Sequence, residues 1–459
     1  QERCSLKCAK MLRDLSSRTT VCMIDASVYN KCVRCGLCLP ACPTYLETMT
    51  ETSGPRGRIS LIKAVAEERL DLLSPGFVHQ MSECLDCRAC AAVCPSGVQY
   101  GELVEAARAQ IEEATAPSRG PLARFLRWFT LRVLFGNLAL MRFVAVLVRF
   151  AQRSGLQAFA RKSGLLRSLH LDEAEAIAPP MSSKFFVPRD QVFKSENAQR
   201  TVFLHAGCIM HVAFAQWDEA TVRVLQRSGC SVVVPRDQGC CGAIAVHAGE
   251  LQFGRELAKR NIEAFERSAA EYYIVNAAGC GSALKEYGQL LSHDPQWKDR
   301  AAAFSSRVRD VLEFLDEVGL APEMGRVDAV VTYQDACHLA HAQRITSAPR
   351  RLLAQIPGVA LREMPESSVC CGSAGIYNLT QPEMAKRLGR RKAENVLATQ
   401  AEVVATANPG CALQMSLHLR ESNSPMRVKH VVELLDESYT NYMDATSRSR
   451  SFSAASSEA

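Results

Sequence analysis

Eight cysteines of this chain occur in two runs that have the same spacing, and a proline follows each run. Thiolates are soft metal ligands, and two-residue gaps let one short loop place three of them around a corner of a metal cluster. A cubane 4Fe-4S cluster needs four such thiolates. The two runs consist of Cys32, Cys35, Cys38 and Cys42, and of Cys84, Cys87, Cys90 and Cys94.

The spacing is typical of two-cluster ferredoxins, in which the fourth cysteine of each run binds the other cluster. Zinc is the alternative metal, but zinc sites use paired CxxC ligands and have no use for a third and a displaced fourth cysteine. The sequence therefore predicts two 4Fe-4S clusters. We expect cluster 1 to be held by Cys32, Cys35, Cys38 and Cys94, and cluster 2 by Cys84, Cys87, Cys90 and Cys42.

A second set of eight cysteines forms two copies of one pattern in the C-terminal half, with a period of about 130 residues. In each copy the first and last cysteines follow apolar runs such as TVFLHAGC and EVVATANPGC, which are typical of buried strands. Helical segments separate these runs, so each copy is predicted to be a small α/β sheet. The cysteines are Cys208, Cys240, Cys241 and Cys280 in the first copy, and Cys337, Cys370, Cys371 and Cys411 in the second.

Four thiolates at the carboxyl edge of such a sheet form a candidate metal site, because ligands collect there and helix amino termini favour negative charge. One or two further iron–sulfur clusters, or zinc ions, fit these donors. His338 and His341 are either metal ligands or hydrogen-bond donors to sulfur or backbone, and the second role is the commoner one. His205 and His247 are weaker candidates for either role.

Composition and charge divide the chain further. With 459 residues and 47% apolar content it can form large cores, which excludes a small disulfide scaffold despite its 20 cysteines. The first twenty residues mix charges and lack an apolar stretch, so we expect a cytoplasmic protein. The expected regions are a disordered leader (1–23), a two-cluster module (24–113), a basic linker (114–199), two α/β copies (200–325 and 326–441) and a disordered tail (442–459).

The linker carries an unusual charge pattern, since residues 114–171 contain ten Arg or Lys and no Asp or Glu. Its longest uncharged run, residues 133–141, is much shorter than the roughly twenty residues that span a bilayer. We expect amphipathic helices that lie on an anionic membrane surface or, alternatively, pack against a partner subunit. Nucleic acid is not an expected partner, because no reading element or aromatic platform accompanies the charge.

The CCG tripeptides and their flanking cysteines resemble the cysteine-rich CCG domain of heterodisulfide reductases and of iron–sulfur subunits of flavin dehydrogenases. Both copies depart from the fullest pattern, because Ala277 and Asn408 stand where the penultimate cysteine would be. Several segments accompany the two runs in a specific order: GPRGRISLIK, CPSGVQY, GCGSALKEYG, CCGSAGIYNLT and TANPGC. This order makes the chain similar to glycolate oxidase iron–sulfur subunits over residues 24–440 or so.

This resemblance implies a ferredoxin-like α+β or α-helical two-cluster module followed by two α/β CCG repeats. It also implies an electron-transfer subunit of an oxidoreductase complex, with no catalytic residues of its own, that passes electrons from a flavin-containing dehydrogenase partner to a respiratory acceptor such as a membrane quinone. That role would favour a peripheral position on the inner face of the cell membrane. The alternatives are a subunit for another hydroxy acid or glycerol 3-phosphate, or a heterodisulfide-reductase-like enzyme. Independently, the sequence has no Gly-rich flavin or nicotinamide fingerprint after a strand.

Overall fold

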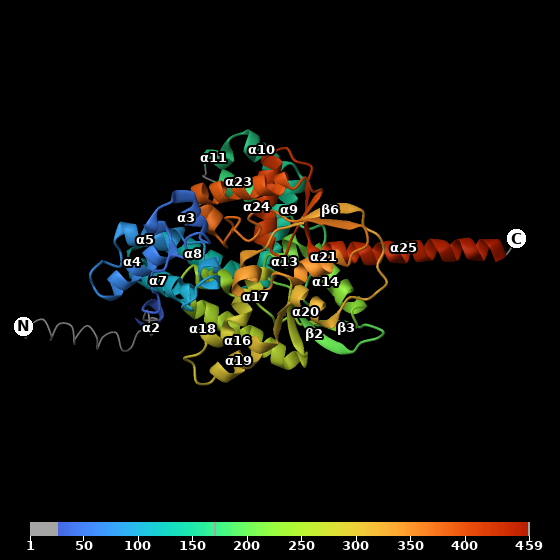
Figure 1. Cartoon of the computed structure of the whole chain (residues 1–459), viewed down its shortest axis with the longest axis horizontal. Helices are drawn as coiled ribbons and strands as arrows, with labels where there is room; N and C mark the ends of the chain where they lie inside the picture. Colours follow the sequence, from blue (N-terminus) through green and yellow to red (C-terminus); the bar gives the residue numbers. More distant parts are fainter. Residues whose placement is uncertain (1–25, 169–170, 458–459) are drawn as a thin grey trace, which may run out of the picture.

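The structure, a computed structural model, describes residues 26–168 and 171–457. The leader predicted for residues 1–23 therefore lies outside the described residues. Figure 1 shows the N-terminal helices in blue at one end of the molecule, and the C-terminal helix α25 projecting from the opposite side.

The N-terminal module is built from helices. They are α2 (Ala26–Tyr29), α3 (Pro43–Thr48), the 3-10 turn η2 (Glu51–Ser53), α4 (Pro55–Ala66), α5 (Pro75–Glu83), α6 (Ala89–Ala92) and α7 (Tyr100–Thr115). Proline occupies the first position of α3, α4 and α5, where the missing N–H leaves no hydrogen bond unmade. Ile62, Phe77, Met81 and Val104 form its core. Since the described part has no strand before Gln191, the helical alternative applies to this module and the α+β one does not.

The linker consists of a series of short helices, as its charge pattern predicts. They are η3 (Ala116–Ser118), α8 (Pro121–Trp128), η4 (Phe129–Leu134), α9 (Leu138–Arg153), α10 (Leu156–Lys162), α11 (Leu165–Ser168) and α12 (Asp172–Ile177). The Asn137 side chain caps α9 by accepting a 2.9 Å hydrogen bond from Ala139 N–H. Within the described residues no single helix is long and apolar enough to cross a membrane. Residues Pro121–Leu134 and Leu138–Arg153 pass that test only as a pair, bent by 107°.

The first α/β region contains a five-stranded sheet in the order β1-β3-β2-β4-β5. Its strands are β1 (Gln191–Phe193), β2 (Arg200–His205), β3 (Cys230–Val234), β4 (Tyr272–Val275) and β5 (Val308–Asp310). All neighbouring strands are parallel except β1 and β3, which are antiparallel. β1 lies within the predicted linker but belongs to this sheet, because it pairs with β3. The helices are α13 (Met210–Ala213), α14 (Ala215–Arg227), α15 (Ala243–His247), α16 (Leu251–Ser268), α17 (Ala278–Lys285), α18 (Tyr287–Leu290), α19 (Lys298–Arg307) and α20 (Val311–Val318).

The second α/β region repeats this arrangement with an all-parallel sheet in the order β7-β6-β8-β9. Its strands are β6 (Ala329–Tyr333), β7 (Val359–Arg362), β8 (Val403–Thr406) and β9 (Arg427–His430). The helices are η5 (His338–Ala342), α21 (Ala348–Ala354), α22 (Tyr377–Thr380), α23 (Pro382–Ala398), α24 (Pro409–Glu421) and α25 (Val431–Ser457). The expectation of a disordered tail from residue 442 differs from the structure, because α25 continues through that segment.

The two regions pack on each other through a shared apolar core that includes Leu204 and Ile274 of one sheet and Val331 and Val403 of the other. Backbone contacts join them where their last cysteines lie. Ala278 N–H donates a 3.0 Å hydrogen bond to the carbonyl of Ala407 at the start of α17 and α24. The carboxyl edges of both sheets therefore face one another.

Candidate metal centres

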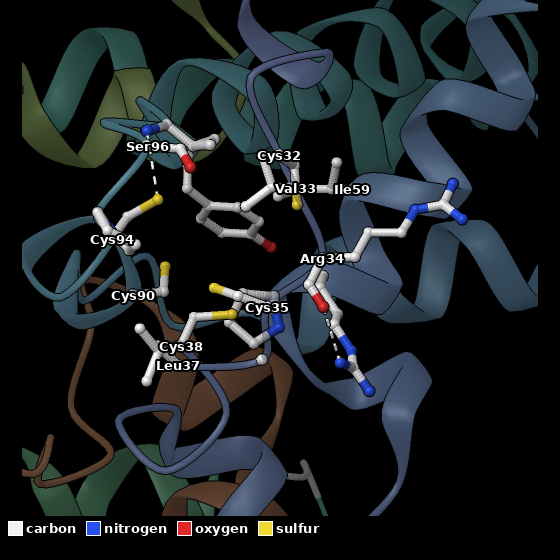
Figure 2. Close-up of a pocket in the computed structure, with 16 residues that line it drawn as sticks. Cys32, Val33, Arg34, Cys35, Leu37, Cys38, Ile59, Cys90, Cys94 and Ser96 are labelled. Atoms are coloured by element: carbon white, nitrogen blue, oxygen red, sulfur yellow. Dashed lines mark hydrogen bonds between the residues drawn. The ribbon is translucent and has the colours of Figure 1, made fainter.

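The first hollow lies where the loop before α3 meets the turn after α6. Cys32, Cys35, Cys38 and Cys94 line it together with Cys90, and Figure 2 shows their sulfur atoms bordering the same space. Gly36 has a φ of +87°, which lets this loop turn back on itself within two residues. Burial raises the pKa of Cys38 to about 11. A thiolate at this position therefore needs a positive partner, and an iron cluster supplies one.

The second hollow is more deeply enclosed and is lined by Cys42, Cys84, Cys87 and Cys90. Cys42 comes from the first run, just as Cys94 in the first hollow comes from the second run. The structure thus brings together the two sets of four predicted from the spacing, while Cys90 borders both hollows. Burial raises the pKa of Cys87 and Cys90 well above the usual range, so these thiols would also ionise only beside a positive partner such as a metal cluster.

Arg58 provides buried positive charge beside the second hollow. Its side chain is 1% exposed, and its Nη2 donates a 3.0 Å hydrogen bond to Glu83 Oε2. It also lines the hollow next to Cys42 and Cys84. Such a charge partly compensates the negative charge that a thiolate-bound cluster would bring into this interior.

The first CCG site lies at the carboxyl edge of its sheet, as predicted. Cys208 follows β2, Cys240 and Cys241 precede α15, and Cys280 lies in the first turn of α17. The sulfur atoms of Cys208 and Cys240 are 3.7 Å apart. The pKa of Cys280 is lowered to about 6, chiefly by a hydrogen bond from Cys241, so this donor favours the thiolate form. The four cysteines form one soft donor set that suits a cluster or zinc.

The second CCG site has the same construction. Cys337 precedes η5, and its sulfur lies 3.8 Å from that of Cys370. Asn408, which stands where the penultimate cysteine of the family pattern would be, donates through Nδ2 to Cys411 Sγ at 3.6 Å. Lys392 is 2% exposed, and burial lowers its pKa, although the nearby Cys371 opposes this shift. This site therefore combines thiols with an amide donor from Asn408 and a buried lysine nearby.

The glycine of each CCG tripeptide is required by the backbone. Gly242 and Gly372 have φ angles of +83° and +87°, which other residues rarely adopt. A Cβ on Gly372 would also lie 2.8 Å from the carbonyl oxygen of Ala385 in α23. The crowding that excludes a side chain at Gly372 thus comes from helix α23.

Two histidines of the second copy bind backbone oxygens. His338 Nε2 lies 3.0 Å from the carbonyl of Asp86, and His341 Nε2 lies 2.8 Å from that of Ser368. These contacts match the commoner of the two roles considered for them. His205, in contrast, has a ring nitrogen within 4.8 Å of the sulfur atoms of Cys241 and Cys280. Sequence patterns make His205 only a weak candidate, although it stands three residues before Cys208.

A largely buried ionic network joins the cluster 2 loop to the first CCG copy, and no sequence pattern predicts it. His247, at the end of α15, lies with Nδ1 3.2 Å from both Asp86 Oδ2 and Glu105 Oε1. Arg88 Nη2 donates to Glu105 at 2.8 Å. Burial alone would lower the pKa of His247, but the two carboxylates raise it to about 9. The raised pKa favours the imidazolium form of His247, whose positive charge would join the two regions and argues against a metal ion at this group.

The cluster 2 loop packs against the second CCG site. Leu85, Cys87 and Ala89 form one apolar cluster with Cys370 and Tyr377, and Cys337 packs against it. Cys208, Cys240 and Cys241 instead pack with Leu138 of the linker, and the described members of that cluster include no residue of the N-terminal module. The described thiolate sites thus have a spatial order in which the second CCG site adjoins the N-terminal module.

Comparison with known proteins agrees with this construction. The family 4Fe-4S dicluster domain matches residues 28–98, and the Cysteine-rich domain family matches residues 202–285 and 331–416. The chain is 43% identical over 426 residues to the probable glycolate oxidase iron-sulfur subunit of Bacillus subtilis, covering 90% of this chain and 95% of that protein. This chain belongs to the glycolate oxidase iron-sulfur subunits. The linker region of that family matches residues 122–178.

Other relatives of this glycolate oxidase iron-sulfur subunit extend the comparison. The glycolate oxidase iron-sulfur subunit of Escherichia coli is 32% identical over 414 residues, which cover 90% of this chain and 94% of that protein. Lactate utilization protein A of Oceanobacillus iheyensis is 30% identical over 236 residues, 51% of this chain and 96% of that protein. The dicluster domain implies two 4Fe-4S clusters, and the two cysteine-rich domains carry the CCG sites.

Proposed function

We propose that this subunit transfers electrons from a flavin-containing partner that oxidises glycolate to a respiratory acceptor. Membership in the glycolate oxidase iron-sulfur subunits supports a place in that oxidoreductase complex. When bound, iron–sulfur clusters accept and release single electrons at potentials set by charge, hydrogen bonds and burial. The chain itself would supply ligands and surroundings and leave substrate oxidation to its partner.

The ligand sets that we propose are those predicted from the spacing, with Cys94 completing cluster 1 and Cys42 completing cluster 2. The two hollows support this exchange, because each contains the first three cysteines of one run and the last cysteine of the other, with Cys90 bordering both. Cys94→Ser should weaken the electron paramagnetic resonance signal of one cubane, and Cys42→Ser that of the other. If both variants lost the same signal, the exchange would be wrong.

The observation that carries the proposed function is the continuity of the thiolate sites. Cys87 lies in one apolar cluster with Cys370, and Cys337 packs against this cluster, so cluster 2 and the second CCG site would adjoin the same packed contact. The surrounding Leu85, Tyr377 and Leu388 exclude water from this contact. A chain that bound its metals only for stability would not need two sites in contact across two domains.

The assembled complex allows a direct test of the function. In a complex with the Cys87→Ser subunit, the flavin partner should still reduce an artificial dye with glycolate, while reduction of a quinone analogue should stop. A matched control is Cys230→Ser, because Cys230 is a buried thiol on β3 outside the candidate sites. Unaltered quinone reduction by the Cys87→Ser complex would refute the relay.

The linker supports a peripheral membrane position for the subunit. On α9 the side chains of Phe143, Val146, Leu147 and Phe150 follow helical spacing and are all exposed. On α8, Phe125 and Trp128 are likewise exposed, next to the exposed Arg124. Exposed aromatic residues flanked by arginine suit the interface of an anionic bilayer, so we propose that this surface lies on the membrane that contains the acceptor.

A further inference from the structure

The first CCG site contains a buried nitrogen donor in addition to its four thiolates. His205 is the last residue of β2 and is 1% exposed. Its Nδ1 lies 2.8 Å from the hydroxyl of Tyr273, a residue of the neighbouring strand β4. In the described part of the chain its Nε2 has no hydrogen-bond partner. A free imidazole nitrogen in a closed interior is costly unless something binds it.

The position of this nitrogen points to the metal site. A ring nitrogen of His205 and the sulfur atoms of Cys241 and Cys280 all lie within 4.8 Å of one another. Because Tyr273 occupies Nδ1, Nε2 is the nitrogen left to act as a donor. Metal-binding histidines usually have their second ring nitrogen fixed by such a hydrogen bond, which sets both the tautomer and the ring orientation.

The second CCG copy has a residue that cannot act as a metal donor in the same way at the position equivalent to His205. Gln334 stands three residues before Cys337, as His205 stands before Cys208. Its Oε1 accepts a 2.8 Å hydrogen bond from Thr406, and its Nε2 donates to a backbone carbonyl, so both ends have partners. Val404 stands seven residues before Cys411, where the first copy has Tyr273 before Cys280. The histidine and the tyrosine that orients it thus occur together in one copy only.

We propose that His205 Nε2 is a metal ligand of the first CCG site, which is thereby a mixed imidazole–thiolate centre, while the second site is bound by thiolates alone. The inference rests on the proposed assignment of the CCG cysteines as metal ligands. His205 would supply a fifth donor to the first site, which lacks the penultimate cysteine of the family pattern because Ala277 stands at that position. Thiolates combined with neutral imidazole suit an iron–sulfur cluster or zinc. In a cluster, exchange of thiolate for imidazole raises the reduction potential, so the two CCG sites would not be equivalent.

The test compares wild-type protein, His205→Gln, which makes the first copy resemble the second, and His205→Cys, which replaces nitrogen by sulfur. Each is purified anaerobically from cells fed ¹⁵N-histidine, and its iron and zinc are counted. For iron, pulsed electron paramagnetic resonance of the reduced protein should show strong ¹⁵N coupling that disappears in His205→Gln. If zinc is found, X-ray absorption at its K-edge should show one nitrogen among sulfurs, again lost in that variant.

Two controls keep the result interpretable. His430→Gln should leave the nitrogen signal unchanged, because His430 is equally buried and lacks an Nε2 partner within the described chain but lies outside the sulfur group. His205→Cys should retain metal with an all-sulfur spectrum, which separates ligand loss from misfolding. A nitrogen signal that persists in His205→Gln would overturn the proposal. If Cys241→Ser removed no metal, the assignment of the CCG cysteines would itself be wrong.

Discussion

The hydroxyl of Tyr377 donates a 2.8 Å hydrogen bond to the backbone carbonyl of Glu83, across the boundary between the second CCG copy and the N-terminal module. Glu83 directly precedes Cys84, and Tyr377 follows the CCG tripeptide by five residues. The bond therefore fixes the start of the cluster 2 loop relative to the second CCG site. Its position suggests that the spacing between two metal centres depends on this tyrosine.

Replacing Tyr377 by Phe should remove this bond and little else. A buried hydrogen bond contributes about 1 kcal/mol, so amide hydrogen exchange in residues 84–90 should become about fivefold faster. Tyr333→Phe is the matched control, because that hydroxyl is buried and has no hydrogen-bond partner among the described residues. Equal exchange rates in both variants would show that the Tyr377 bond does not hold the loop.

Arg58 should influence both stability and the potential of cluster 2. In Arg58→Met the carboxylate of Glu83 stays buried without its partner, which costs about 3 to 5 kcal/mol of the free energy of unfolding. Loss of the positive charge should also make the reduction potential of cluster 2 more negative. Thermal melting and a potentiometric titration followed by electron paramagnetic resonance measure these effects.

Two further substitutions isolate the charge of Arg58. Arg58→Lys keeps a positive charge, so its potential should stay nearer to that of the wild type. Arg69→Met removes an exposed arginine that pairs with Glu67 and should leave the potential unchanged. If Arg58→Met left the potential of cluster 2 at its wild-type value, this charge would have no electronic role.

The His247 network predicts a pH dependence of stability. The pKa of His247 is raised from its ordinary value of 6.5 to about 9, so the folded state binds this proton more tightly than the unfolded state. The resulting stabilisation is fully present below about pH 6.5 and is lost as the pH rises through about 9. This stabilisation amounts to at most about 3 kcal/mol, because the His247 side chain is 22% exposed and solvent weakens its interaction with the two carboxylates.

Melting temperatures of the wild type and His247→Gln, recorded from pH 6 to 9.5, check this prediction. The wild type should lose stability across that range, and the two proteins should converge at the alkaline end. His79→Gln serves as the control, because the side chain of His79 is 58% exposed. Parallel curves for wild type and His247→Gln would rule out the imidazolium.

The exposed linker surface should bind anionic vesicles. Phe125→Ser, Phe143→Ser and Phe150→Ser together should weaken binding to phosphatidylserine-containing vesicles by about tenfold or more, because apolar area no longer enters the interface. Leu379→Ser, an exposed leucine on α22, is the control. If the triple variant bound vesicles normally but lost its flavin partner, the alternative of subunit docking would replace the membrane proposal.

Sequence patterns gave the local part of this structure. Each lone cysteine follows a strand, because a continuous apolar run such as that before Cys208 or Cys411 usually forms a buried strand in an α/β domain. The repeat was visible for the same reason, since cysteine spacing and strand order recur together in β3-β2-β4-β5 and β7-β6-β8-β9.

Contacts between distant segments were not predictable in this way. The pairing of β1 with β3 depends on how the end of the linker meets the first sheet, and the contact of Asp86 with His247 depends on how two domains dock. Neither has a signal in local composition. The role of Tyr273 beside His205 becomes visible only when β2 and β4 are placed side by side. The serine-rich composition after residue 442 indicates disorder, but α25 continues through that segment.

The proposed function requires that thiolates of this chain bind iron in adjoining sites. The most direct measurement is the iron and acid-labile sulfide content of anaerobically purified protein, together with its electron paramagnetic resonance spectrum after reduction. We expect about eight iron atoms and eight sulfides per chain from the two cubanes alone, with signals of two interacting clusters. Colourless protein without iron, prepared under the same conditions, would contradict this expectation.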